Sequence, residues 1–224
     1  MVSALAPPSI GLRPPPLVAG LYLGDLLVAA LAVIGFLVAG AGGADFVAVG
    51  EESNLPTWYT SSQLLLVALG LGLLAARDIR RDSLRTWPLL LGPAFFLLLS
   101  LDEAAMLHER LGDWFMAETS AGEGLRTGPW MFVYAPLAAL VFGAAVRAYW
   151  PYWRGRRLLV GLVLAGVVVY GASAVGLEFV ANFVGEGSLA QKGLGFAEEL
   201  GEMVGVTTLL WGVAVLLRWE GVRV

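Results

Sequence analysis

One short stretch of the sequence, residues 100–110, carries many side chains that could do chemistry. It contains Asp102, Glu103, Glu109 and His108, the only histidine of the chain. The stretch directly follows an apolar run long enough to lie in a lipid bilayer, where ionisable side chains are costly to place. Ionisable groups at such a position mark a candidate functional site by default.

Two later apolar segments also carry polar side chains. They are Glu178, Asn182, Glu198, Glu199 and Glu202. With a helical rise of about 1.5 Å per residue, Asp102, Glu178 and Glu202 reach similar depths in the outer half of a membrane. We therefore expect these three carboxylates to converge on one site that opens to the outer side.

Carboxylates that crowd a low-dielectric region must take up protons, pair with cations or bind a metal ion. The chain has no cysteine and one histidine, so a metal would be held mainly by oxygen ligands, which suits Mg²⁺, Ca²⁺, Mn²⁺, Zn²⁺ or iron. We expect a divalent metal ion with four ligands: Asp102, His108, Glu178 and Glu202. Glu199 or Glu103 would act as general base on a metal-bound water. Four further polar residues are candidates without an assigned chemical role: Glu109, Asn182, Glu198 and Asp25.

The elements that must position these residues are predicted from the composition. Of the 224 residues, 58% are hydrophobic and 14% are charged, against about 25% charged residues in soluble domains. Six apolar segments are each close to the ~20 residues that span a bilayer: 17–41, 58–77, 86–109, 129–149, 158–183 and 194–218. The sequence predicts an all-α, polytopic bundle of six transmembrane helices over residues 17–219, after a Pro-rich N-terminal tail at residues 1–16.

The basic residues are distributed unevenly over the two sides of this bundle. Eleven of the 14 Lys and Arg residues fall on one side, and only Arg110, Arg126 and Lys192 fall on the other. The positive-inside rule assigns the side with eleven to the cytoplasm, which places both termini there and the candidate site on the outer side. We expect the protein in the inner (cytoplasmic) membrane, with the lipid bilayer as its partner and no nucleic acid.

Two segments together resemble a known group of proteins. They are Ser100-Leu-Asp-Glu-Ala-Ala with His108-Glu109, and Glu198-Glu-Leu-Gly-Glu-Met-Val-Gly205. They are similar to bacterial and archaeal multi-pass membrane proteins that have a Leu-Asp-Glu…His-Glu segment and a Glu-Glu…Glu-Met…Gly segment. That group has no established activity, so the resemblance implies no reaction. The alkaline ceramidase-like superfamily is an analogy only, because it needs a His-x-x-x-His pair that this chain lacks.

Three functions fit these residues. The first is a metal-dependent hydrolase or transferase that acts on a lipid or another membrane-borne substrate. The second is a proton- or cation-coupled transporter or channel, in which the same acids bind the cation. The third is a structural or assembly subunit whose acids only hold helices together.

Overall fold

The computed structural model describes residues 13–39, 54–80, 86–119 and 130–222. Within these ranges the chain is helical and contains no β-strand. Six helices there are long and apolar enough to cross a membrane: Pro16–Val38, Leu55–Ile79, Trp87–Ala105, Trp130–Trp153, Arg157–Ala181 and Leu189–Trp219. The prediction of an all-helical membrane protein with six helices able to span a bilayer is therefore confirmed. Residues 1–12 of the predicted N-terminal tail lie outside the described residues.

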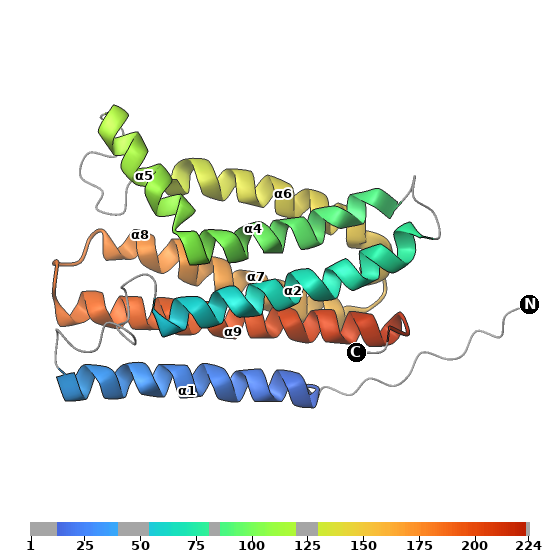
Figure 1. The fold of residues 1–224 in the computed structure, drawn as a ribbon, viewed down its shortest axis with the longest axis horizontal. Helices are drawn as coiled ribbons and strands as arrows, with labels where there is room; N and C mark the ends of the chain where they lie inside the picture. The colour runs from blue at the N-terminus through green and yellow to red at the C-terminus, as the bar shows by residue number, and fades with distance from the viewer. Residues whose placement is uncertain (1–12, 40–53, 81–85, 120–129, 223–224) are drawn as a thin grey trace, which may run out of the picture.

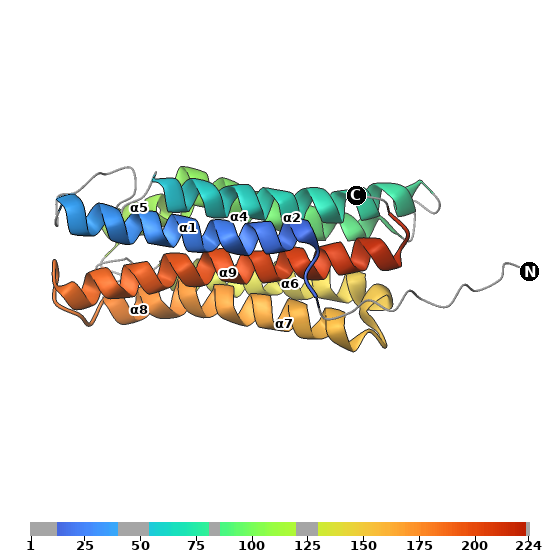
Figure 2. The ribbon, with the colours of Figure 1, turned by 90° about the horizontal axis from the view of Figure 1, so that it is seen from below.

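The long helices run side by side (Figures 1 and 2). They are α1 (Pro16–Ala39), α2 (Leu55–Ile79), α4 (Leu91–Ala105), α6 (Trp130–Trp153), α7 (Arg157–Gly171) and α9 (Leu189–Trp219). The central helix is α9, which packs against α1, α2, α7 and the segment that follows α7. The shorter α5 (Leu107–Glu118) leaves the bundle at an angle at one end (Figure 1).

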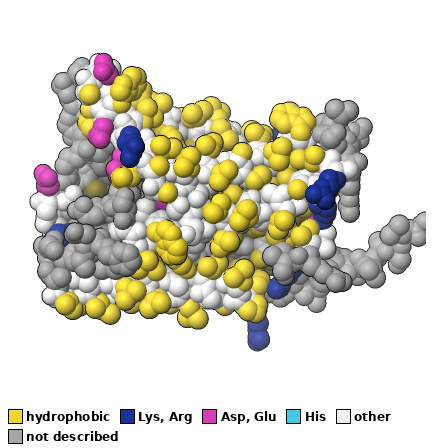
Figure 3. Space-filling view, viewed as in Figure 1, with side chains coloured by type: hydrophobic (Ala, Val, Ile, Leu, Met, Phe, Trp, Pro, Cys, Tyr) yellow, Lys and Arg dark blue, Asp and Glu magenta, His cyan; other side chains and the backbone are white. Residues whose placement is uncertain are grey.

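The two ends of the bundle differ in charge. We call the end at which α4 meets α5 the acidic end, because acidic side chains gather there (Figure 3). The opposite end, where α2, α6 and α9 finish, is called the basic end; it holds Arg77, Arg156 and Arg218. Large apolar side chains are exposed between the two ends, for example Leu140 (73%) and Val168 (64%). Such a band is expected where helices face lipid rather than water.

Glycines bring α7 and α9 into close contact. A Cβ atom on Gly205 would lie 2.6 Å from the backbone nitrogen of Tyr170, and one on Gly166 would lie 2.9 Å from the backbone oxygen of Gly205. A Cβ on Gly201 would collide with the hydroxyl of Ser173. Small residues at helix contacts allow this approach in membrane proteins. The contact fixes the position of the α9 carboxylates relative to Glu178.

Two of the predicted helices end or bend at positions that no sequence pattern marks. The predicted helix 86–109 is a 3₁₀ turn (Trp87–Leu90) followed by α4, which ends at Ala105. Met106 then takes the left-handed conformation (φ 53°, ψ 45°), so His108 and Glu109 belong to a separate helix, α5. The predicted helix 158–183 is α7, a π-helical segment (Ala172–Leu177) and the single turn α8 (Glu178–Ala181).

The start of α9 also differs from the prediction of residue 194. Ser188 caps this helix, because its hydroxyl accepts a hydrogen bond from the backbone N–H of Gln191 (3.1 Å). Glu198 and Glu199 therefore lie well inside α9 and not in its first turn. The helix dipole acts within the first turn, so it gives no reason for acids at these two positions.

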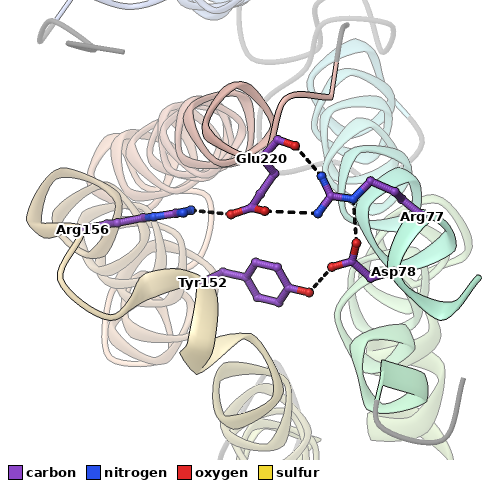
Figure 4. A network of polar contacts seen from close by, with 5 residues as sticks. All are labelled: Arg77, Asp78, Tyr152, Arg156 and Glu220. Carbon is purple, nitrogen blue, oxygen red and sulfur yellow. Dashed lines mark hydrogen bonds and ion pairs between the residues drawn. The ribbon is translucent and has the colours of Figure 1, made fainter. Parts of the chain in front are cut away.

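A network of polar side chains ties the helices together at the basic end (Figure 4). Arg77 donates to the Asp78 carboxylate (2.6 Å), the Glu220 carboxylate (3.2 Å) and the Glu220 backbone oxygen (2.5 Å). Arg156 forms an ion pair with the other Glu220 oxygen (2.9 Å), and the Tyr152 hydroxyl donates to Asp78. The network joins the ends of α2, α6 and α9 to the start of α7.

The Arg77→Ala substitution is expected to lower the stability of the bundle. It removes the side chain that contacts both the Asp78 and the Glu220 carboxylates, and these groups are mostly buried. We expect a loss of about 1–3 kcal/mol, seen as a lower Tm of the purified protein. The exposed Arg154 at the same end is the control, and Arg154→Ala should leave the Tm unchanged. Equal Tm values for the two variants would contradict the structural role of the network.

Candidate functional site

A cavity of about 450 Å³ opens in the acidic half of the bundle, between α4, α6, α7, α8 and α9. Its polar wall holds one histidine, one glutamine and seven carboxylates: Asp102, Glu103, Glu109, Glu178, Glu198, Glu199 and Glu202. Its apolar wall is formed by side chains further from the acidic end, including Phe95, Phe96, Phe142, Val167 and Leu209. The cavity is within the usual size range of small-molecule sites, roughly 300–1,000 Å³.

Asp102 and His108 form a hydrogen-bonded pair at the junction of α4 and α5. One oxygen of Asp102 accepts from the backbone N–H of His108 (2.8 Å), and the other lies 3.0 Å from Nδ1 of its ring. The left-handed turn at Met106 makes this contact possible, because it folds α5 back toward the end of α4. A non-glycine residue in that conformation is strained, and such strain is often found at functional sites.

The environment of His108 affects its protonation. Burial alone lowers the pKa of the imidazole, but the hydrogen bond and the charge of Asp102, with the charges of Glu178 and Glu109, more than offset this effect. The net result is a raised pKa. When the ring is neutral and donates its Nδ1–H to Asp102, its Nε2 atom is the proton acceptor. Asp102 thus sets both the orientation and the tautomer of His108.

An aromatic group covers the ring of His108. The centroid of the Trp130 ring lies 4.5 Å from that of His108, and the Tyr134 ring packs edge-on against Trp130 at 5.9 Å. Trp130 is buried, and its Nε1–H donates to the Glu178 carboxylate (2.9 Å). Trp130 and Tyr134 are not among the site residues that the sequence predicts. The only signal in the sequence is an aromatic pair spaced by one helical turn at the start of a segment.

The π-helical segment Ala172–Leu177 presents Glu178 to the cavity. Its wide turns separate α7 from α8, and Ala174 and Val175 of this segment line the cavity beside Glu178. Single π-helical insertions in α-helices are frequent at functional sites. Across the cavity, Glu202 is buried, and the Oε2 atom of Glu199 is buried without a hydrogen bond to any residue in the described ranges.

The structure therefore brings most of the predicted site residues together. Asp102, Glu178 and Glu202, from three separate helices, line one cavity, as do His108, Glu103 and Glu199. Two predicted polar residues are not among its lining residues. Asn182 donates to the backbone oxygens of Glu178 and Phe179, and so closes the end of α8. Asp25 lies on the opposite side of α9, where it contacts Gln63 and Thr207.

The predicted metal ligands share a cavity without forming an ion site. In the part of the chain that the structure describes, no three His, Asp or Glu side chains are grouped so that they could hold a metal ion. Both oxygens of Asp102 contact His108, and one oxygen of Glu178 accepts from Trp130. A divalent metal remains a prediction, and binding would require these side chains to rearrange.

Fold and site together define a helical membrane protein with a cavity lined by carboxylates and one histidine. The chain belongs to the family of the domain of unknown function DUF8692, whose profile matches residues 20–218. No curated protein and no solved structure matches it.

Proposed function

We propose that this protein is a membrane-embedded hydrolase or transferase that acts on a membrane-borne, amphipathic substrate. The observation that carries the proposal is the Asp102–His108 pair, which lines a cavity with one polar and one apolar wall. A histidine held by a carboxylate is a common proton-transfer pair. A cavity with a long apolar wall suits the chain of a lipid-like molecule. The acids of a purely structural protein would not need such a cavity.

The side chains at the polar wall supply the groups that such a reaction needs. His108 would accept the proton of the attacking water or hydroxyl group, and Asp102 would stabilise the imidazolium that forms. Glu199 or Glu103, in its protonated form, would donate a proton to the leaving group as the bond between that group and the substrate breaks. Glu178 and Glu202 would bind the positive charge of a cation or of the substrate.

The charge of the cavity limits the substrate class. The described residues that line it include seven carboxylates and neither lysine nor arginine. A phosphate-bearing group would be repelled, because phosphates are recognised by basic side chains and free backbone N–H groups. The polar end of the substrate is therefore neutral or cationic, or it binds together with a metal ion.

A divalent metal ion fits this charge, and we propose that it binds between Glu178 and Glu202, which leaves Nε2 of His108 free to accept a proton. Adding Mn²⁺ or Zn²⁺ to the metal-free protein should raise its Tm in a saturable way, because a ligand that binds only the folded state stabilises it. Glu202→Gln should reduce that rise, whereas the exposed Glu186→Gln should not. If no divalent ion changes the Tm, the proposal of a bound metal is wrong. The reaction would then depend on acid–base chemistry of the side chains alone.

We also propose that the basic end faces the cytoplasm of the inner membrane and that the cavity opens on the outer side. The support is the excess of basic residues at the basic end. Reporter fusions after Arg80 and after Glu118 should then give signals from opposite sides of the membrane. Signals from the same side would mean that the chain does not cross the membrane between Arg80 and Glu118. That result would overturn both this orientation and the prediction of six crossings.

Occupancy of the cavity can be tested by native mass spectrometry of the protein extracted from its own membrane. We expect a bound amphipathic molecule in the wild type. Ala138→Trp should displace it, because Ala138 lines the cavity. Ala144→Trp, at an exposed position on the same helix, should not. Equal lipid binding by the two variants would show that the cavity is not the binding site.

A proton- or cation-coupled transporter is the second candidate. One observation favours it: the fully buried Asp25 provides a carboxylate inside the bundle but outside the cavity. Coupled movement of an ion and a substrate needs ionisable groups within the membrane segments. The enzyme is the better-supported function, because Asp102 and His108 form the hydrogen-bonded pair that proton transfer requires.

A further inference from the structure

A second polar cluster lies on the side of α9 that faces away from the cavity. It joins Asp25 of α1, Gln63 of α2 and Thr207 of α9, which are 0%, 1% and 0% exposed. The amide nitrogen of Gln63 donates to one oxygen of Asp25 (2.7 Å) and to the hydroxyl of Thr207 (2.8 Å). Thr207 donates to the same Asp25 oxygen (3.2 Å).

Within the described ranges, the hydrogen bonds of this cluster do not satisfy all of its buried oxygen atoms. The second carboxylate oxygen of Asp25 and the amide oxygen of Gln63 make no hydrogen bond to any residue that the structure describes. The hydroxyl of Thr60, one helical turn before Gln63, is also buried and unpaired within those ranges. Tyr59, which packs over Gly24, donates its hydroxyl to the Leu21 backbone, and the same hydroxyl lies close enough to Asp25 and Gln63 to interact with both.

Among the described residues, no basic side chain balances the charge of Asp25. None of the ion pairs among the described residues includes it. An unpaired buried carboxylate is costly, and the buried oxygens around it would remain unsatisfied as well. A proton on Asp25 removes the charge but provides one donor for several acceptors. A bound cation removes the charge and can satisfy several oxygens at once.

We propose that Asp25, Gln63, Thr60 and Thr207 bind a monovalent alkali cation, with Na⁺ as the ion to test. The available ligands are carboxylate, amide and hydroxyl oxygens, which suit a hard cation. A single carboxylate balances one positive charge and not two. The cation holds α1, which makes few other contacts, against α2 and α9. This site lies outside the cavity, so its test does not depend on the reaction proposed there.

The test uses the full-length protein in lipid nanodiscs, with its Tm measured in NaCl and in choline chloride at equal ionic strength. Na⁺ should raise the Tm of the wild type in a saturable way. Asp25→Asn should abolish this response, and its Tm in choline chloride should equal or exceed that of the wild type. Thr207→Val should raise the half-saturating Na⁺ concentration about tenfold. The control Glu186→Gln, at an exposed position outside both sites, should keep the wild-type response.

Direct binding of radioactive Na⁺ to the wild type keeps the proposal testable if Asp25→Asn does not fold. Bound label should be displaced by unlabelled Na⁺ and not by choline. The proposal is overturned if the wild type binds no label and has the same Tm in both salts. It is also overturned if Asp25→Asn responds to Na⁺ as the wild type does, since Asp25 would then act only as a protonated helix contact.

Discussion

The Gly205→Ala variant is expected to be strongly destabilised or to fail to fold. A Cβ atom at this position would lie 2.6 Å from the backbone nitrogen and 2.9 Å from the Cα atom of Tyr170. Backbone atoms of a packed helix cannot move aside as a side-chain tip can. Overpacking of this kind costs about 1–3 kcal/mol, and more where the neighbour is rigid. The α7–α9 contact that positions Glu178 and Glu202 would be lost with it.

Thermal unfolding of the purified variants measures this effect. Gly143→Ala on α6 is the matched control, because nothing lies within 4 Å of its added Cβ atom. Alanine is a better helix former than glycine by about 1 kcal/mol, so Gly143→Ala should keep or slightly raise the Tm. A Gly205→Ala protein as stable as Gly143→Ala would show that α7 and α9 are further apart than in this structure.

The second large effect is expected at Asp102. Asp102→Ala removes both contacts to His108 and should lower turnover of the membrane-borne substrate by roughly 100-fold to 10,000-fold, the range for loss of a proton-transfer group. It also removes an acceptor at the start of α5, which should cost about 1 kcal/mol of stability. Turnover and Tm, measured on the same samples, separate the two effects.

Asp102→Asn makes the test sharper. Asparagine can still accept from the backbone N–H of His108, so its Tm should stay close to that of the wild type. Its side chain is neutral and cannot stabilise the imidazolium, so turnover should fall nearly as far as in Asp102→Ala. If Asp102→Asn is fully active, the pair only joins α4 to α5, and His108 is not the proton acceptor.

The apolar segments predicted the six long helices, because a membrane requires continuous apolar runs and satisfied backbone groups. Their order and the helical rise also placed Asp102, Glu178 and Glu202 at similar depths, and the structure finds them around one cavity. These features depend on period and length, which a single sequence contains.

The length and period of the apolar segments do not predict local changes in backbone conformation. Met106 takes a left-handed conformation that glycine usually adopts, and no residue type in the stretch 100–110 signals a break. A continuous helix would place His108 well around the axis from Asp102, whereas the break brings the two into contact. No sequence pattern predicts the π-helical segment before Glu178 either. Both depend on tertiary contacts that only the folded chain supplies.

Turnover of a membrane lipid extract tests whether the cavity performs chemistry on a membrane-borne molecule. Purified wild type and Asp102→Asn are each incubated with the total lipid extract of the native membrane, and all species are compared by mass spectrometry. We predict that the wild type depletes one class of neutral or cationic amphipathic molecule and yields its hydrolysis or transfer products, whereas Asp102→Asn leaves that class intact. Unchanged lipid profiles with the wild type, or equal depletion by both proteins, would contradict an enzyme that uses Asp102 and His108.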